Sequence, residues 1–195
     1  MITVGFIWLL AYILGSLPFG VWLARSRSVD LRQHGSGNIG ATNVARTLGK
    51  KAGLLVLLAD GCKGVVSVAI ADQALATSWE VGTAGLMAFL GHLFSVFLKF
   101  KGGKGVAVGL GVFLYLMPFA ALSAIAVFAV AIGFSKYVSI GSMTAALAIP
   151  LFGALYTAPL PYIYLSMIIA LIVIWKHKDN IRRLVAGEES VFLRK

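Results

Sequence analysis

The basic residues of this 195-residue chain are confined to a few short segments, and long apolar runs almost without charge lie between them. Of the 17 lysines and arginines, all but Lys63 fall within residues 25–51, 99–104, 136 and 176–195. The turns between the other apolar runs carry no basic residue. Because lysine and arginine mark the cytoplasmic ends of membrane spans, this pattern predicts a polytopic membrane protein with every basic segment in the cytoplasm.

Composition supports the same class. Hydrophobic residues make up 59% of the chain and charged residues 12%, which would leave a soluble domain with an insoluble surface. The net charge of +10 therefore indicates anionic headgroups or an anionic substrate as partners, and no nucleic acid. The single cysteine, Cys62, excludes an internal disulfide and a multi-thiolate metal site, so we expect no metal and no cofactor.

Seven apolar runs are candidate spans. They cover residues 2–24, 53–75, 81–98, 105–117, 119–135, 138–157 and 160–176. The first run precedes its basic residues, opposite to a secretory signal peptide, which predicts an N-terminus outside the cell. Lys104 and Lys136 belong to basic segments on the same side of the membrane. The chain between them, which contains the runs 105–117 and 119–135, must therefore cross the membrane twice or turn back at Pro118. We expect one all-α domain over residues 1–195, with seven spans and a cytoplasmic C-terminus.

The first basic segment contains the glycine-rich run 34–46, His-Gly-Ser-Gly-Asn-Ile-Gly-Ala-Thr-Asn-Val-Ala-Arg. Gly35, Gly37 and Gly40 match G-x-G-x-x-G, but a membrane helix precedes them instead of a strand, which excludes a dinucleotide fold. Glycines let backbone N–H groups turn toward an anion, and the residues that follow could open a helix at residue 41. The segment is either an anion-binding loop or a glycine-rich turn with a capping residue.

The second basic segment reads Lys101-Gly102-Gly103-Lys104-Gly105. Bare backbone donors and two cations within five residues suit a phosphate. The segment is not a Walker loop, because Leu98 and Gly105 stand where that motif needs Gly and Ser or Thr. An ordinary membrane anchor would explain the lysines but not the glycines. His92, at the end of the preceding helix, is equally consistent with a structural and a catalytic role.

The third segment follows the last span. His177, Asn180 and Arg183 share a helical face, although a basic tail lying on anionic lipid would also carry such charges. Within the second span, Asp60 and Lys63 are charged residues in an apolar run, and we expect them to pair with each other or with a site because unpaired charge in a bilayer is costly.

In chain order, these segments resemble the PlsY family of bacterial acyl-phosphate:glycerol-3-phosphate acyltransferases. The resemblance rests on Ser36-Gly37-Asn38, Gly40-Ala41-Thr42-Asn43, Arg46, Asp60, Lys63-Gly64, Gly91-His92, Phe100 to Ala107, His177, Asn180-Ile181, Arg183-Leu184, Gly187 and Glu189. The chain departs from the family pattern at Ile39 and Ser95, where prolines are expected, and at Val108, where threonine is usual. None of these departures removes a charged or phosphate-binding group.

The resemblance implies transfer of a fatty acyl group from acyl phosphate to the 1-hydroxyl of glycerol 3-phosphate, giving lysophosphatidic acid and phosphate in phospholipid biosynthesis. It also implies a bacterial inner-membrane enzyme with a cytoplasmic active site. We expect Lys104, His177 and Ser36 to be catalytic. The expected substrate-binding residues are Ser36, Gly37, Asn38, Gly40, Ala41, Thr42, Asn43, Arg46, Lys101, Gly102, Gly103, Lys104, His177 and Asn180. Structural or supporting roles are expected for Asp60, Lys63, His92, Arg183 and Glu189.

In that scheme Ser36, Arg46, Lys104, His177 and Asn180 hold glycerol 3-phosphate, while backbone N–H groups of residues 40–43, and of residues 101–103, cradle the acyl phosphate. No H-x-x-x-x-D acyltransferase motif is present, because Ile39, Phe97 and Arg182 occupy the position where each histidine would need its aspartate. The acyl phosphate is already activated, so its own oxygen can accept the hydroxyl proton, which leaves His177 as either a binding residue or a base.

Two other classes remain open at this stage. A transporter for a phosphorylated metabolite would also need basic residues and broken helices, but it should bind near the bilayer midplane and not at one face. A noncatalytic scaffold would not need glycine-lined anion pockets. The oligomeric state and the acyl-chain preference are not encoded in any pattern described above.

Overall fold

Helices are the regular elements of the part of the chain that the computed structural model describes, residues 1–191. No strand occurs among those residues, which confirms the predicted all-α class. The elements are α1 (Ile2–Ser16), α2 (Phe19–Arg25), η1 (Leu31–Gln33), α3 (Ala41–Leu48), α4 (Lys50–Ala74), α5 (Ser78–Leu93), η2 (Val96–Leu98), α6 (Val106–Leu116), α7 (Pro118–Ser135), α8 (Val138–Leu155), α9 (Leu160–Lys176) and α10 (Lys178–Val185).

Among the described residues, five helical segments are long and apolar enough to cross a membrane: Ile2–Arg25, Lys50–Ala74, Ser78–Leu98, Pro118–Ser135 and Val138–Leu155. A sixth is obtained if α9 and α10, which meet at a bend of 52°, form one span. Helix α6 has 11 residues and is therefore about 16 Å long, roughly half of a 30 Å hydrocarbon core. The part of the chain that the structure describes thus has seven apolar helical segments, but the count of seven spans stays a prediction.

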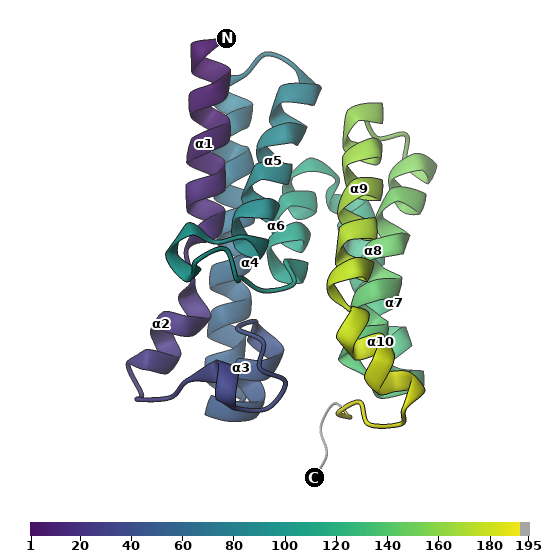
Figure 1. Ribbon diagram of the computed structural model, residues 1–195. Coiled ribbons are helices and arrows are strands. Elements are labelled where there is room, and N and C mark those ends of the chain that lie inside the picture. Colours follow the sequence, from purple (N-terminus) through teal and green to yellow (C-terminus); the bar gives the residue numbers. More distant parts are fainter. Residues whose placement is uncertain (192–195) are drawn as a thin grey trace. The chain divides into compact units, whose positions relative to one another are not determined.

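The described chain divides into two compact units, Met1–Tyr115 (unit 1) and Leu116–Lys195 (unit 2), so the expectation of one domain also stays a prediction. In unit 1, α1 packs along α5 and α4, and α3 packs on α4 (Figure 1). The α1–α5 contact depends on glycine, because a Cβ on Gly15 or Gly91 would clash with the backbone of the other helix at Ala88 or Tyr12. Small residues at such crossings let helix backbones approach closely in a membrane.

The first apolar segment is broken between α1 and α2, at Leu17 and Pro18. Proline has no backbone N–H and therefore cannot continue the helical hydrogen bonds of α1. The break turns the chain into α2, which leads to the glycine-rich run. The hydropathy pattern alone predicted one uninterrupted segment over residues 2–24.

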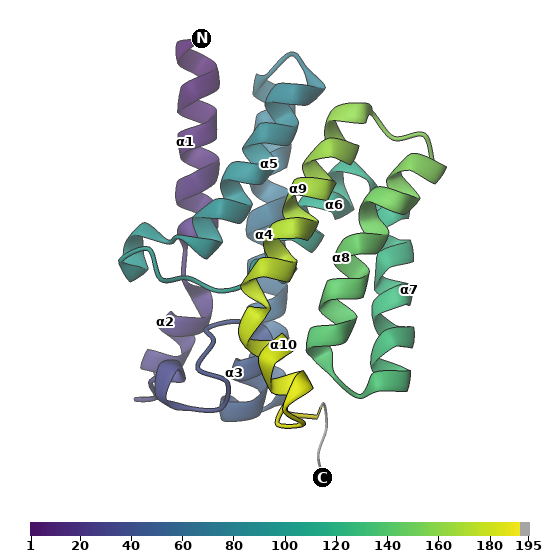
Figure 2. The same ribbon diagram turned by 45° about the vertical axis from the view of Figure 1, so that its right-hand side comes forward.

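Unit 2 is built from α7, α8 and α9, each of which packs against its neighbour in sequence (Figures 1 and 2). Pro118 stands at the first turn of α7, where a missing N–H is tolerated, so it separates α6 from α7 as expected. Helix α10 continues from α9 after the bend at His177.

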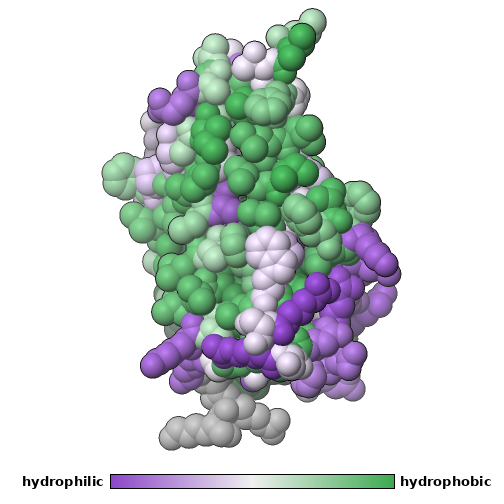
Figure 3. All heavy atoms as spheres, turned by 90° about the vertical axis from the view of Figure 1, so that its left-hand side faces the viewer, coloured by the Kyte–Doolittle hydropathy of each residue, from purple (hydrophilic) through white to green (hydrophobic). Residues whose placement is uncertain are grey.

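Hydrophobic side chains cover most of the face of unit 1 seen in Figure 3, and hydrophilic side chains gather toward the end where α2 and α3 lie. Arg25, Arg27, Arg32, Lys50 and Lys51 are exposed. The surface therefore has the apolar belt and charged end of a membrane protein.

Candidate functional site

The glycine-rich run of unit 1 folds as an ordered loop around the side chain of Asn43, which is 1% exposed. Its amide nitrogen donates hydrogen bonds to the carbonyls of Leu31, His34 and Asn38, at 3.1, 3.0 and 2.8 Å. Its Oδ1 accepts the backbone N–H of Ser36 at 2.9 Å. The amide thus contacts four backbone groups of residues 31–38, three carbonyls and one N–H.

Glycine is required beside this side chain. Gly35 has a φ of +59°, and a Cβ there would clash with Asn43 Oδ1. Gly37 also has a positive φ, at +69°. Two of the three glycines in the run therefore allow left-handed backbone turns, which other residues adopt only with strain.

Helix α3 begins at Ala41, as expected from the sequence, with Gly40 as its N-cap. The N–H groups of Ala41 and Thr42 lie in the first turn, where no carbonyl of the helix can accept them. The N–H of Asn43 donates to the Gly40 carbonyl at 3.0 Å and the Asn43 side chain is occupied by the loop. This geometry corrects the expected cradle of residues 40–43: the Asn43 N–H is already used, which leaves the first-turn amides as its donors.

The second basic segment is tied to the end of α5. The N–H groups of Gly102 and Gly103 donate to the carbonyls of Leu93 and His92, at 3.0 and 3.1 Å, and that of Lys101 donates to Leu98 at 3.1 Å. A Cβ at Gly103 would clash with His92 Nε2. The prediction that N–H groups of residues 101–103 cradle a phosphate is therefore wrong, because all three are used within the chain. Their glycines are explained by close packing on α5.

One hydrogen bond joins the two basic segments. Arg32 Nη2 donates to the Lys101 carbonyl at 2.8 Å, across 69 positions of sequence. Arg32 is held in turn by η1, whose N-cap Asp30 accepts the Arg32 backbone N–H at 3.0 Å. Sequence reasoning missed Arg32, since nothing in its neighbourhood distinguishes it from other basic residues of the segment.

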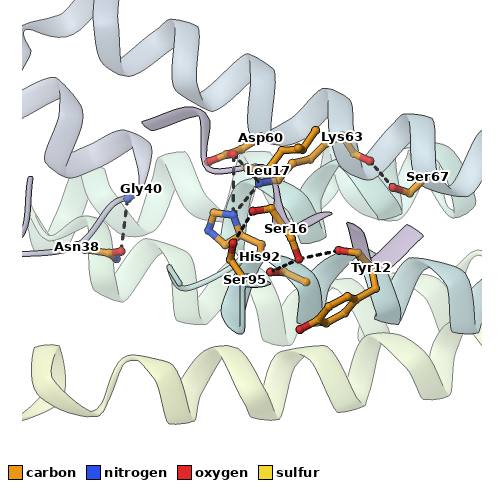
Figure 4. A network of polar contacts seen from close by, with 11 residues as sticks. Tyr12, Ser16, Leu17, Asn38, Gly40, Asp60, Lys63, Ser67, His92 and Ser95 are labelled. Atoms are coloured by element: carbon orange, nitrogen blue, oxygen red, sulfur yellow. Dashed lines mark hydrogen bonds and ion pairs between the residues drawn. The ribbon is translucent and has the colours of Figure 1, made fainter. Parts of the chain in front are cut away.

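The remaining predicted residues of unit 1 follow Arg32 or Lys101 in the sequence. Ser36, Asn38, Thr42 and Lys104 are half-buried, and Arg46 is exposed in the last turn of α3. Asn38 Oδ1 lies 3.4 Å from the Gly40 nitrogen (Figure 4).

The charged pair predicted within the second span is present. Lys63 Nζ lies 2.9 Å from Asp60 Oδ1, and both side chains are buried. The same ammonium donates to the Leu17 carbonyl at 2.8 Å and lies 2.9 Å from His92 Nδ1 (Figure 4). His92 is 6% exposed. Sequence reasoning predicted the pairing of Asp60 with Lys63 and a structural or supporting role for His92, but it did not predict that His92 joins the pair.

Ser95, where the resemblance predicts proline, is buried and donates to the Ser16 carbonyl at 2.6 Å. Ser16 in turn donates to the carbonyls of Tyr12 and Gly91, at 2.8 and 3.2 Å. The serine therefore fastens the end of α5 to the end of α1, so this departure from the family pattern adds a contact.

In unit 2, His177 stands at the bend between α9 and α10 and is 2% exposed. Its Nδ1 lies 2.7 Å from the Val173 carbonyl, and because a carbonyl can only accept, Nδ1 carries a proton. The imidazole orientation is thereby fixed by α9, and Nε2 is the other nitrogen with which the ring can act.

The carboxylate of Glu189 organises α10. It accepts hydrogen bonds from Ser139 Oγ at 2.8 Å, Asn180 Nδ2 at 2.6 Å and Arg183 Nε at 2.8 Å. Burial by itself raises the pKa of Glu189, but the hydrogen bonds from Asn180, Arg183 and Ser139 outweigh it, so the pKa lies below its ordinary value. Ser139, on α8, was not predicted from the sequence because it lies 50 residues from its partner.

The residues expected to hold glycerol 3-phosphate are thus distributed over both units. Ser36, Arg46 and Lys104 belong to unit 1, and His177 and Asn180 belong to unit 2. Their union in one site stays a prediction. Unit 1 also contains a cavity of about 560 Å³ between α2, the loop at residues 28–32 and η2, and none of the predicted site residues lines it.

The comparisons with known proteins agree with one another. The family model described as glycerol-3-phosphate acyltransferase matches residues 5–187. A glycerol-3-phosphate acyltransferase of Geotalea daltonii is 50% identical over 184 residues, covering 94% of this chain and 95% of the relative. One from Fusobacterium nucleatum is 45% identical over 185 residues, with 94% and 95% covered.

Two solved structures are similar over nearly the whole chain. The crystal structure of PlsY (YgiH), an integral membrane glycerol 3-phosphate acyltransferase, in its glycerol 3-phosphate form has a TM-score of 0.94 and 41% identity, covering 97% of this chain and 96% of that one. Its lysophosphatidic acid form has a TM-score of 0.91 and 40% identity, covering 97% and 95%.

Proposed function

Because the chain belongs to the PlsY family of glycerol-3-phosphate acyltransferases, we propose that it takes its acyl group from acyl phosphate and transfers it to the 1-hydroxyl of glycerol 3-phosphate. The products are lysophosphatidic acid and inorganic phosphate. The relatives' descriptions name the acceptor, and one neighbouring structure is a lysophosphatidic acid form. Both substrates carry a phosphate group, and the two basic, glycine-rich segments are of the kind that binds phosphate.

The observation that carries this proposal is the junction of those segments in unit 1. The Arg32 hydrogen bond to the Lys101 carbonyl joins η1, which packs against α3, to the segment that begins at Lys101. Amide donors at a helix N-terminus and nearby ammonium groups together stabilise a dianionic phosphate. We assign the first-turn amides of Ala41 and Thr42, with Ser36, to phosphate contacts, and Lys104 to the charge that develops on the leaving group.

In the proposed reaction the 1-hydroxyl oxygen attacks the acyl carbon, the bond from that carbon to the phosphate oxygen breaks, and the phosphate departs with the hydroxyl proton. No protein nucleophile is needed, since the acyl phosphate is a mixed anhydride. Catalysis then consists mainly of positioning and charge neutralisation. His177, with Nδ1 committed to Val173, would orient glycerol 3-phosphate through its other nitrogen, together with Asn180.

The proposed active site lies on the cytoplasmic side of a bacterial inner membrane. The concentration of basic residues in the segments that carry the motifs supports that side. The relatives supply the bacterial origin. A transporter is less well supported, because both the curated relatives and the solved structures are acyltransferases.

The test is turnover by the purified protein in lipid or detergent. Phosphate release from palmitoyl phosphate should depend on glycerol 3-phosphate and should match the lysophosphatidic acid formed. Lys104→Ala should lose at least about tenfold in kcat while its thermal unfolding stays unchanged. Release that does not depend on the acceptor, or uptake of glycerol 3-phosphate into sealed vesicles without product, would contradict the proposal.

A further inference from the structure

The ammonium group of Lys63 is fully engaged inside the apolar part of unit 1. A protonated lysine has three N–H donors and no acceptor. Around Lys63 Nζ lie three acceptors: Asp60 Oδ1 at 2.9 Å, the Leu17 carbonyl at 2.8 Å and His92 Nδ1 at 2.9 Å (Figure 4). The Leu17 carbonyl and His92 Nδ1 are hydrogen-bond partners of the ammonium group, whereas Asp60 Oδ1 meets it as an ion pair without hydrogen-bond geometry. The three groups come from three parts of the chain.

Two of the three contacts, Leu17 and His92, lie at helix ends that lead into the two basic segments. Leu17 ends α1 at the break before Pro18, and the chain then runs through α2 to the loop that holds Ser36. His92 lies in the last turn of α5, where its carbonyl accepts the Gly103 N–H at 3.1 Å and its ring packs against Gly103. The same cation is thus bonded to the origin of one loop and, through His92, to the other.

Burying the charges of Lys63 and Asp60 in an apolar helix costs free energy. Lys63 is 5% exposed and Asp60 3% exposed, on a helix apolar enough to span a membrane. A pair of apolar residues of similar size would usually stabilise such a position equally well or better. The charged pair is therefore explained by the contacts that it makes with other segments, and not by a contribution to the stability of the protein.

We propose that Lys63, held by Asp60, is a positioning residue for acyl transfer. Its ammonium group fixes the α1–α2 break and the end of α5 to α4, and so sets the distance between the loop at residues 35–40 and the segment at residues 101–104. The proposal rests on the proposed function, because it assigns the two loops to one reaction. Lys63, Asp60 and His92 do not touch substrate in it.

The role of His92 follows from the same geometry. A protonated Lys63 can only donate, so His92 Nδ1 accepts its hydrogen bond. A general base would instead have to gain and lose a proton during turnover. An asparagine side chain can place a carbonyl oxygen near the position of Nδ1, whereas leucine cannot accept a hydrogen bond.

This difference provides the first experiment, a comparison of His92→Asn with His92→Leu. We expect His92→Asn to stay within about threefold of wild-type kcat/KM and His92→Leu to lose about tenfold or more, with the same pH profile in both. If His92→Asn is as inactive as His92→Leu, His92 acts as more than an acceptor and the proposal is overturned. Full activity in both variants would also overturn it.

The second experiment measures position without turnover. Spin labels are placed at two exposed sites, Gln33→Cys at the end of η1, just before the loop at residues 35–40, and Phe97→Cys in η2, just before the segment at residues 101–104, with Cys62→Ser as background. Electron paramagnetic resonance then reports the distribution of distances between the labels. Lys63→Met should broaden this distribution, whereas Lys50→Met, which removes an exposed lysine, should leave it unchanged.

If Lys63→Met does not fold, His92→Leu in the same labelled background decides the question, because it retains the ion pair and removes one contact of Lys63. An unchanged distribution in either folded variant would refute the positioning role. This outcome is separable from the proposed function. Wild-type protein that fails to turn over acyl phosphate would disprove the reaction, while the measured distances would still report whether Lys63 fixes the position of the two loops.

Discussion

At the scale of single residues, the Glu189 carboxylate accepts three hydrogen bonds while its side chain is only 5% exposed. Glu189→Gln removes the charge, and its amide NH₂ group would face side chains that also donate. We expect it to destabilise the protein by about 2 kcal/mol, the range for a charge-assisted hydrogen bond, and to lower the unfolding temperature in detergent. Glu188→Gln, an exposed neighbour, is the matched control and should change neither.

The lowered pKa of Glu189 gives this carboxylate a pH signature. A carboxylate whose folded pKa is depressed contributes stability that is fully present above its unfolded value, which is ordinarily 4.5, and that is lost as the pH falls through the folded pKa. Between about pH 6 and pH 3, wild type should therefore lose more stability than Glu189→Gln. Parallel pH profiles for the two proteins would show that Glu189 has no such linkage.

Asn43 offers a second test of a single side chain. Asn43→Asp preserves size and one acceptor oxygen but removes the amide donors that three loop carbonyls use. We expect it to be at least as damaging as Asn43→Ala, with kcat/KM reduced about tenfold or more, because a buried carboxylate would face those carbonyls. Higher activity in Asn43→Asp than in Asn43→Ala would mean that the donors are dispensable. Gln33→Ala, at an exposed position of the same segment, is the control.

At the scale of elements, the contact between α5 and the Lys101–Lys104 segment depends on glycine. Gly103→Ala would force its methyl group against the His92 ring, and a shift of about 1 Å in a substrate loop can reduce the rate about 100-fold. We expect Gly103→Ala to lose activity while its far-UV circular dichroism is retained. Gly133→Ala, in α7, has no atom near the added methyl group and should be neutral.

The elements themselves were largely predictable. Hydropathy placed the run 53–75 within three residues of α4, and the run 138–157 within two residues of α8. Glycine-rich sequence and spacing also indicated the helix that begins at Ala41. The break at Leu17 was missed because the residues on both sides are apolar, and hydropathy does not register the loss of a backbone donor at proline.

At the scale of the whole molecule, the unresolved question is how many times the chain crosses the bilayer. Single cysteines in a Cys62→Ser background can decide it with a membrane-impermeant thiol reagent applied to intact cells. Ser78→Cys and Phe119→Cys should be labelled from outside, and Phe97→Cys should be protected. Protection of Phe119→Cys would mean that α6 turns back within the membrane, and the seven-span prediction would then be wrong.

Hydropathy, charge distribution and motif spacing were enough to predict the helical membrane class, the apolar segments and the family, because they are properties of neighbouring residues. Only the tertiary structure decided that Asn43 supports its own loop, that the N–H groups of residues 101–103 are already bonded, and that Lys63 meets His92. The Lys63–His92 contact joins residues 29 positions apart, and the other two outcomes depend on how the backbone turns within each segment. Whether a donor is available to a substrate depends on those turns, and hydropathy and motif spacing do not record them.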